Sequence, residues 1–160
     1  MLTLIKNADM GTVKAEIQRL LVDGICSPEV RRLATDIVGH ENEVASVFDW
    51  VRMNVRYIHD PYLGNGELFV SPVKQVSNYR EGKQLLGDCD CHALLTAALL
   101  GSIGHKVKIV LLDMDFDGEL DHAIAQAWSE KLGWVNLDTS STKPLGWTIK
   151  CRWKVDVEPI

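Results

Sequence analysis

Apolar residues follow a helical period in the first part of the chain and alternate with polar residues in the last part. In the first part they recur every three or four positions, which predicts amphipathic helices over 12–22, 28–38 and 41–55. Gly24 is typical of a helix end, so we expect the first of these helices to stop before it. Each predicted helix has one apolar stripe, and all three stripes must be buried against other elements.

The middle of the chain combines an irregular segment with the most apolar one. Residues 59–86 contain several glycines and prolines and have no sustained period, so we expect a long surface connection with at most one short helix near 71–77. Residues 93–100 are apolar almost all round a helix and follow a polar turn. This pattern predicts a central buried helix that begins after Asp88.

From His105 onward the apolar positions recur with a period of about two. Strands are expected over 107–111, 122–128 and 134–138, and the turns between them predict an antiparallel meander. The tail alternates again over 147–155, which predicts a half-buried edge strand. Helices followed by strands predict an α+β fold, in which the N-terminal helices and the central buried helix pack on a C-terminal antiparallel sheet.

Composition and charge narrow the class of protein. The chain has 160 residues and no repeat or linker divides it, so we interpret 1–160 as one domain, with 1–40 as a helical N-terminal extension of a core at 41–160. Lys and Arg total 17 against 22 Asp and Glu, which leaves no basic excess for binding a nucleic acid. No segment reaches the roughly 18 apolar residues of a membrane span, and the first residues do not resemble a signal peptide. We therefore expect a protein of the cytoplasm with neither a nucleic acid nor a membrane as its partner.

The segment GDCDCHA at 87–93 carries the strongest chemical signal. The chain has four cysteines, too few for a disulfide-rich scaffold, so a reactive thiol has to be considered. If Asp88 caps the following helix, Cys89 is its first residue, where free N–H groups and the helix dipole favour a thiolate. The carboxylates of Asp88 and Asp90 oppose this effect. A histidine from elsewhere in the fold is therefore the expected partner of the thiol.

Two later residues complete a candidate triad. His122 begins the second predicted strand and Asp138 ends the third. In this order Cys89, His122 and Asp138 supply a nucleophile, its base and an acid that orients the imidazole. Their separation depends on the register of the meander, which the spacing leaves open.

Three segments resemble the transglutaminase-like superfamily, a branch of the papain-like cysteine-protease folds. They are GDCDCHALLTAALLGSIGHKVKIV, DHAIAQAW and GWVNLDTS, and the similarity to small standalone members from bacteria and their phages extends over about 41–148. The resemblance implies that Cys89 is the nucleophile, His122 the base and Asp138 the orienting acid, held together where the core helix meets the sheet. One departure is Cys91, because many relatives have an acidic residue at this position.

The chemistry implied by the resemblance is acyl transfer at a peptide or side-chain amide. The Cys89 thiolate attacks the carbonyl, His122 protonates the leaving amine, and water hydrolyses the resulting thioester. The backbone N–H of Cys89 is one expected oxyanion donor, and Tyr57 is a candidate for the second. We expect hydrolysis, by a cysteine protease or amidase, because the chain is too short for the additional β-domains of dedicated cross-linking enzymes.

Two other functions stay open on the same fold. Attack of an amine on the thioester would make the protein a protein-glutamine transamidase. Loss of activity would leave a non-catalytic binding or virion-assembly module, which the resemblance to phage members keeps open and which would place the protein in the host cytoplasm or the virion. For either enzyme the expected partner is a peptide or protein amide, and no cofactor is expected.

Two clusters imitate metal sites without completing one. Cys89, Cys91 and His92 could be zinc ligands, but a second cysteine pair is missing. The run of aspartates from Asp113 imitates the start of a calcium loop, but its twelfth residue is not a glutamate, so we interpret it as a solvated hairpin turn and expect no metal.

The other cysteines and histidines receive no catalytic role. Cys26 and Cys151 are assigned to the core or an interface, and Cys91 and His92 to packing and local hydrogen bonds. His105 is assigned to the surface, and His40 and His59 have no partner motif.

Overall fold

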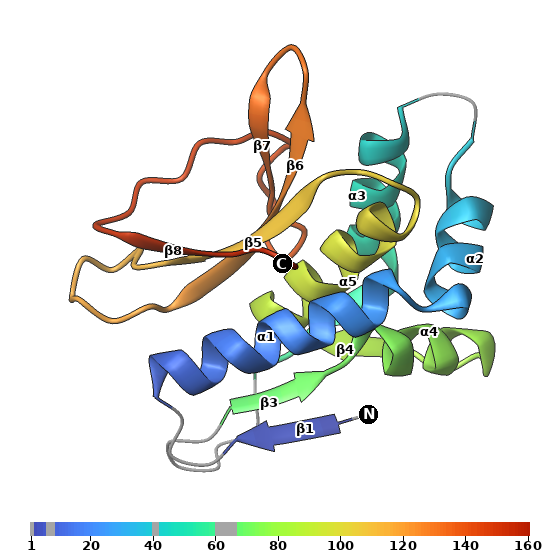
Figure 1. Cartoon of the computed structure of the whole chain (residues 1–160), viewed down its shortest axis with the longest axis horizontal. Helices are drawn as coiled ribbons and strands as arrows, with labels where there is room; N and C mark the ends of the chain where they lie inside the picture. Colours follow the sequence, from blue (N-terminus) through green and yellow to red (C-terminus); the bar gives the residue numbers. More distant parts are fainter. Residues whose placement is uncertain (1, 6–8, 40–41, 60–66) are drawn as a thin grey trace.

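A computed structural model describes residues 2–5, 9–39, 42–59 and 67–160. Over these residues it contains a group of helices, a four-stranded antiparallel sheet and two further strand pairs (Figure 1). In chain order the elements are β1 (Leu2–Ile5), α1 (Met10–Ile25), α2 (Pro28–Ile37), α3 (Glu43–Asn54), β2 (Val55–Tyr57), β3 (Glu67–Val70), α4 (Pro72–Arg80), β4 (Leu85–Gly87), α5 (Cys89–Ser102), β5 (Val107–Leu112), β6 (His122–Ser129), β7 (Gly133–Leu137) and β8 (Lys154–Val157). The α+β class predicted from the sequence is confirmed.

The three N-terminal helices match the prediction except at the end of α1. The side chains of Ser27 and Asn42 cap α2 and α3 by accepting hydrogen bonds from N–H groups of the first turn. The expected stop before Gly24 is wrong, because α1 runs through this residue to Ile25. A Cβ atom on Gly24 would lie 2.8 Å from the Cβ of Ala98, so glycine here permits close packing of α1 on α5.

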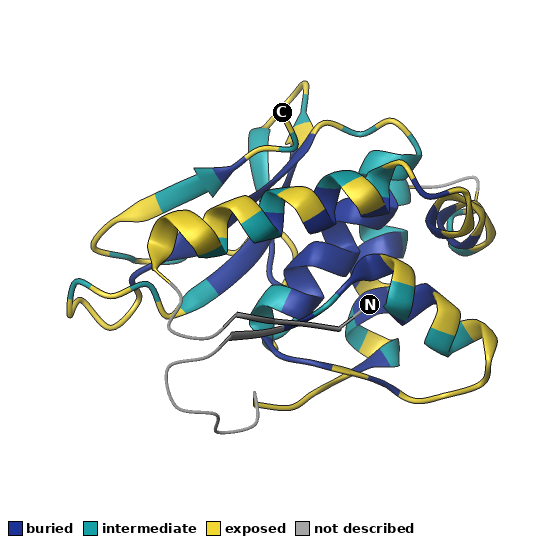
Figure 2. Ribbon diagram, turned by 60° about the horizontal axis from the view of Figure 1, so that its bottom comes forward, coloured by how far each residue is buried: buried dark blue, intermediate teal, exposed yellow. Residues whose placement is uncertain are grey.

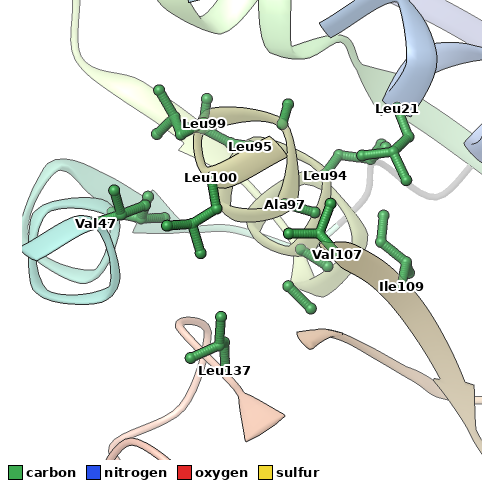
Figure 3. Close-up of a cluster of buried hydrophobic side chains, with 14 of the residues drawn as sticks. Leu21, Val47, Leu94, Leu95, Ala97, Leu99, Leu100, Val107, Ile109 and Leu137 are labelled. Carbon is green, nitrogen blue, oxygen red and sulfur yellow. The ribbon is translucent and has the colours of Figure 1, made fainter. Parts of the chain in front are cut away.

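The central helix α5 is buried as predicted. Every residue from Cys91 to Leu100 is buried, and Figure 2 shows the buried residues at the centre of the molecule. The helix contacts α1, α2, α3 and α4 as well as β6. Figure 3 shows its leucines among side chains of other elements, including Leu21 of α1, Val47 of α3 and Leu137 of β7. The first two helices therefore share one core with the sheet. None of the described helices combines the length and the apolarity needed to cross a membrane.

The main sheet has the strand order β7-β6-β5-β8, and all of its pairs are antiparallel. The predicted meander of β5, β6 and β7 is confirmed. Strand β6 places Ala123, Ala125 and Ala127 in the core that contains α5, and these small side chains allow the helix to lie close to the sheet. Ala125 pairs with Leu137, so the start of β6 lies beside the end of β7.

The tail forms a shorter strand than its alternation predicts. Only Lys154–Val157 pairs with β5, so the expected edge strand over 147–155 is wrong for most of its length. The preceding segment packs on a second apolar cluster of the sheet: Ile149 and Cys151 contact a group formed by Val110, Leu112 and Ile124. Two backbone hydrogen bonds join Asp113 to Arg152 and Trp153 just before β8, whereas Trp147 and Trp153 are exposed. Of the apolar positions before β8, Ile149 and Cys151 are therefore the ones that pack on the sheet.

The expected surface connection over 59–86 is also wrong, because this segment contributes two strands and a helix longer than predicted. β3 pairs antiparallel with β1, and β4 pairs parallel with β2. β3 has four residues and β4 has three, which is too short for a period to be visible in the sequence. Tyr57 pairs with Gly87, so β2 lies directly beside the start of α5. Residues 60–66 lie outside the described residues.

Candidate active site

The turn from β4 into α5 places Cys89 at the first position of the buried helix. Asp88 caps the helix as predicted, and its side chain accepts a hydrogen bond from the N–H of Cys91 at 3.4 Å. Gly87 precedes it with no space for a side chain, because a Cβ atom there would lie 2.4 Å from the Cβ of Cys91. Cys89 thus lies in the first turn of the helix, at the positive end of the helix dipole.

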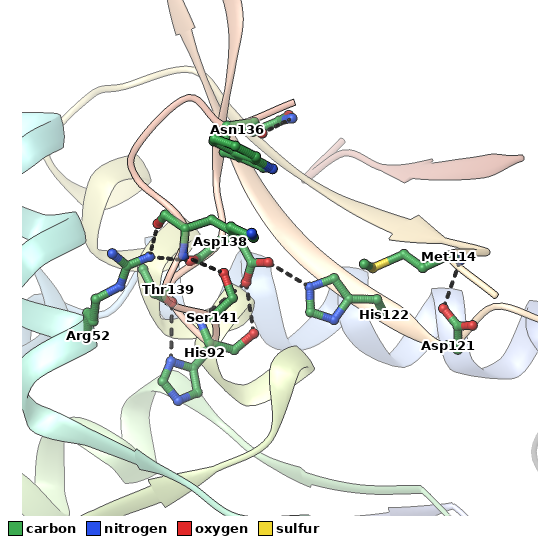
Figure 4. A network of polar contacts seen from close by, with 12 residues as sticks. Arg52, His92, Met114, Asp121, His122, Asn136, Asp138, Thr139 and Ser141 are labelled. Atoms are coloured by element: carbon green, nitrogen blue, oxygen red, sulfur yellow. Dashed lines mark hydrogen bonds and ion pairs between the residues drawn. The ribbon is translucent and has the colours of Figure 1, made fainter. Parts of the chain in front are cut away.

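His122 and Asp138 form a hydrogen bond between the start of β6 and the end of β7. His122 Nε2 lies 2.9 Å from Asp138 Oδ2, which confirms the expected proximity of the two residues (Figure 4). Asp138 Oδ1 accepts hydrogen bonds from the hydroxyl and the N–H of Ser140. Burial raises the pKa of Asp138, but the hydrogen bond and charge of His122 and the hydroxyls of Ser140 and Ser141 lower it by more, so the carboxyl is ionised at neutral pH. An ionised Asp138 accepts a hydrogen bond from Nε2–H of His122, which leaves Nδ1 of the imidazole for proton exchange.

Cys89 and His122 line the same cavity, which has a volume of about 530 Å³. Tyr57 and Ala123 also line it, and the backbone N–H of Ala123 forms a hydrogen bond to the Cys89 thiol. Asp138 lies behind His122, outside the residues that line the cavity. The three residues predicted from the sequence thus come together, with the thiol and the imidazole in the cavity and the carboxylate behind the imidazole.

The thiol of Cys89 is held in its neutral form. Burial raises its pKa most, and the charges of Asp90 and Asp88 raise it as well, whereas the hydrogen bond from Ala123 lowers it. The positive end of the helix does not overcome these effects, in agreement with the opposing carboxylates noted in the sequence. A base must therefore remove the proton as the thiol attacks, and His122 lies in the same cavity.

Cys91 and His92 have the packing and hydrogen-bonding roles predicted for them. Cys91 is buried against the backbone of Gly87. His92 is also buried, and its Nδ1 lies 3.2 Å from the hydroxyl oxygen of Thr139. Burial lowers the pKa of His92 to about 4, so the ring is neutral at pH 7.

Three other assignments change. Cys26 is predicted to lie in the core or at an interface; it is exposed, because it follows the last buried turn of α1, so the core alternative is wrong. His105 is half-buried rather than a free surface residue, and its Nε2 lies 2.9 Å from a glutamate oxygen of α3. His59 lines the cavity and contacts the ring of Tyr57 edge-on, although no sequence motif includes it. His40 lies outside the described residues.

The cysteine–histidine cluster weighed as a zinc site does not form one group of ligands. In this segment the possible ligand atoms that lie within 4.8 Å of one another belong to Asp88, Asp90 and Cys91. Cys89 lies in the cavity instead, and His92 binds Thr139.

A second acidic group holds the turn between β5 and β6. Asp113, Asp117 and Asp121 bring their carboxylates within 4.8 Å of one another. The oxygens of Asp113 accept hydrogen bonds from the N–H groups of Asp117 and Gly118, and those of Asp121 accept from two further N–H groups of the turn. Asp113 is fully buried, so its interpretation as part of a solvated turn is wrong. These carboxylates act as hydrogen-bond acceptors for the turn.

One residue near the candidate triad is absent from the sequence prediction. Arg52 of α3 donates hydrogen bonds from Nη2 to the carbonyl oxygens of Asp138 and Lys143. No sequence signal identifies this contact, because its acceptors are main-chain atoms and Asp138 is 86 positions away.

The model of the transglutaminase-like superfamily matches residues 29–139. The chain therefore belongs to the transglutaminase-like superfamily. Comparison of the chain with curated proteins gives no match.

Two solved structures have a similar fold. The crystal structure of a "putative cysteine protease" from Cytophaga hutchinsonii has a TM-score of 0.58 and 18% identity, with 95% of this chain and 47% of that one covered. A structure of the Rad4/XPC nucleotide excision repair complex has a TM-score of 0.52 and 10% identity, with 96% of this chain and 50% of that one covered. The chain thus spans about half the length of each, and at these identities the similarity concerns the fold.

Proposed function

We propose that the protein catalyses acyl transfer at a peptide or side-chain amide through Cys89, His122 and Asp138, with hydrolysis as the outcome. The observation that carries the proposal is the 2.9 Å contact between His122 Nε2 and Asp138 Oδ2, beside a cavity that also contains the Cys89 thiol. Membership of the transglutaminase-like superfamily supports a cysteine protease-like function.

The first half of the reaction forms a thioester. The Cys89 thiol transfers its proton to Nδ1 of His122 as the sulfur attacks the carbonyl carbon. The backbone N–H of Cys89 stabilises the oxyanion that forms, and Tyr57 in the cavity wall is the candidate second donor. His122 then protonates the leaving amine, and the carbon–nitrogen bond breaks.

The second half regenerates the thiol. His122 accepts a proton from a water molecule as the water oxygen attacks the thioester carbon. The carbon–sulfur bond then breaks, and His122 returns the proton to the sulfur of Cys89. Asp138 holds the imidazole in one tautomer and stabilises the imidazolium in both halves. An amine in place of water would give transamidation with the same residues.

The test is a product analysis with an unfolded protein as generic amide substrate. The protein is incubated with this substrate in ¹⁸O-labelled water, with and without a primary amine, and mass spectrometry identifies the products. Hydrolysis predicts ¹⁸O in new C-termini or in deamidated side chains, whereas transamidation predicts attached amine.

The variants that carry the test are C89A and H122A, with C91A as the matched control. We expect C89A and H122A to form no product and C91A to retain activity, with far-UV circular dichroism confirming that each is folded. Product formation by folded C89A at the wild-type rate would contradict the proposal.

A further inference from the structure

Arg52 holds the segment that follows β7. Its Nη2 donates a hydrogen bond of 2.8 Å to the carbonyl oxygen of Asp138 and a second one to the carbonyl oxygen of Lys143. Its guanidinium lies 4.3 Å from the centroid of the Phe48 ring, so a cation–π contact also fixes the direction of the side chain. One side chain of α3 thereby closes the loop over 138–143 at both of its ends (Figure 4).

The next residue of this loop is attached to the helix of the nucleophile. The hydroxyl of Thr96 donates to the carbonyl oxygen of His92, so it accepts the hydrogen bond from the hydroxyl of Thr139. The Thr139 oxygen in turn accepts from Nδ1–H of His92. Thr139 is therefore fixed to α5, while the side chain of Arg52 binds the main chain of Asp138 itself.

The carboxylate of Asp138 depends on the placement of this main chain. Its Oδ1 accepts two hydrogen bonds from Ser140, within the same loop, and its Oδ2 meets His122 Nε2. If the loop moved, the carboxylate and Ser140 would move together, and the contact with His122 would lengthen. The hydrogen bond from Arg52 to the Asp138 carbonyl resists this movement from outside the loop, together with the attachment of Thr139 to α5.

We propose that Arg52 is a positioning residue: it fixes the backbone of Asp138 so that Oδ2 meets His122 Nε2 and the imidazole keeps its orientation toward Cys89. The consequence for catalysis rests on the proposed function, whereas the consequence for the hydrogen bond between His122 and Asp138 does not. A purely structural Arg52 would contribute to stability and leave that hydrogen bond unchanged in the folded protein.

The test compares R52M and R52Q with R80M as the matched control. Arg80 also binds through Nη2, to Asp36 at 2.8 Å, but on the surface and away from the site. The first measurement is the downfield proton NMR signal of Nε2–H of His122 in ¹⁵N-histidine-labelled protein, assigned with H122A. The second is the rate at which iodoacetamide alkylates Cys89, measured by peptide mass spectrometry.

We expect R52M and R52Q to lose or broaden the His122 signal and to alkylate Cys89 between roughly tenfold and a hundredfold more slowly, because displaced catalytic groups cost rates of this order. R80M should match the wild type in both measurements. A folded R52M that keeps the signal and the alkylation rate overturns the proposal. If R52M does not fold, R52Q decides by the same two criteria.

H122A and D138A, measured in parallel, separate this proposal from the proposed function. If both leave the alkylation rate of Cys89 unchanged, the triad proposal fails, and the NMR signal still decides the role of Arg52. If both lower the rate while R52M and R52Q do not, only the positioning role of Arg52 fails.

Discussion

A Cβ atom on Gly87 would lie 2.4 Å from the Cβ of Cys91, so the turn into α5 has space only for glycine. The carbonyl oxygen of Gly87 also accepts the N–H of Ile58 at 3.0 Å, which joins this turn to the end of β2. The position of Cys89 at the start of α5 thus depends on a residue without a side chain.

We therefore expect Gly87→Ala to lower the free energy of unfolding by about 1–3 kcal/mol, the usual cost of overpacking a buried position. Urea denaturation measures this change. Gly39→Ala is the control, because a Cβ atom there has no heavy atom within 4 Å, and it should change stability little. A G87A protein as stable as the wild type would contradict this expectation, because the turn could then accommodate a Cβ atom with no loss of unfolding free energy.

The two neighbouring cysteines should differ sharply in reactivity. Cys89 lines the cavity with His122, whereas Cys91 is buried beneath the turn. Iodoacetamide followed by peptide mass spectrometry should therefore label Cys89 before Cys91, and H122A should slow the labelling of Cys89. Alkylation of Cys91 that is faster and depends on His122 would reverse the assignment of the nucleophile.

Charge at the helix start adds to burial in raising the pKa of this thiol. Because the carboxylate of Asp90 raises the pKa of Cys89, Asp90→Asn should lower that pKa and increase the alkylation rate at pH 7. The measurement is the alkylation rate as a function of pH, with Asp36→Asn as a surface control. A D90N profile that coincides with the wild-type profile would mean that burial alone holds the thiol neutral.

The acid of the candidate triad should matter for rate more than for folding. Asp138→Asn keeps the size of the side chain but removes the charge that orients the imidazole, so activity should fall by roughly 10²–10⁴-fold. Ser140→Ala is the matched control, because it removes one hydrogen bond to Asp138 and leaves the charge, and its effect should be much smaller. A D138N variant with near wild-type turnover would exclude Asp138 from the reaction.

The elements that the sequence predicts correctly are those with a long period or a local signal. The burial of α5 is predicted because apolar residues occur on all sides of the helix, and its start is predicted because Asp88 is a typical N-cap residue. The meander is visible because β5 and β6 have six and eight residues, long enough for alternation. His122 and Asp138 are predicted as partners from their places at strand ends and from the family resemblance, while their 2.9 Å contact depends on the register of β6 and β7.

The features that the sequence does not reveal depend on tertiary contacts. Gly24 looks like a helix end, but its lack of a side chain serves the packing of α1 on Ala98. β3 and β4 find partners far away in the chain and are too short to show a period. Arg52 donates its hydrogen bonds to main-chain carbonyl oxygens. Every residue has such an oxygen, so the residue types in the sequence do not indicate this contact.

The neutral, buried His92 predicts a loss of stability in mild acid. Burial lowers its pKa from the usual 6.5 to about 4, so between these values the unfolded chain binds a proton that the folded protein does not. The free energy of unfolding should therefore fall as the pH decreases from 6.5 toward 4, by up to about 3 kcal/mol for this one group.

Urea denaturation at pH 7.5, 6.5 and 5.0 tests this for the wild type and for His92→Asn. The asparagine can still donate a hydrogen bond to Thr139 but does not titrate, so the variant should be less dependent on pH between 6.5 and 5.0, whatever its stability at pH 7.5. Equal slopes for the two proteins, or an NMR titration that places the pKa of His92 near 6.5, would show that the folded protein binds a proton at His92 below pH 6.5 as the unfolded chain does. In that case its Nδ1 contact with Thr139 would not require a neutral imidazole.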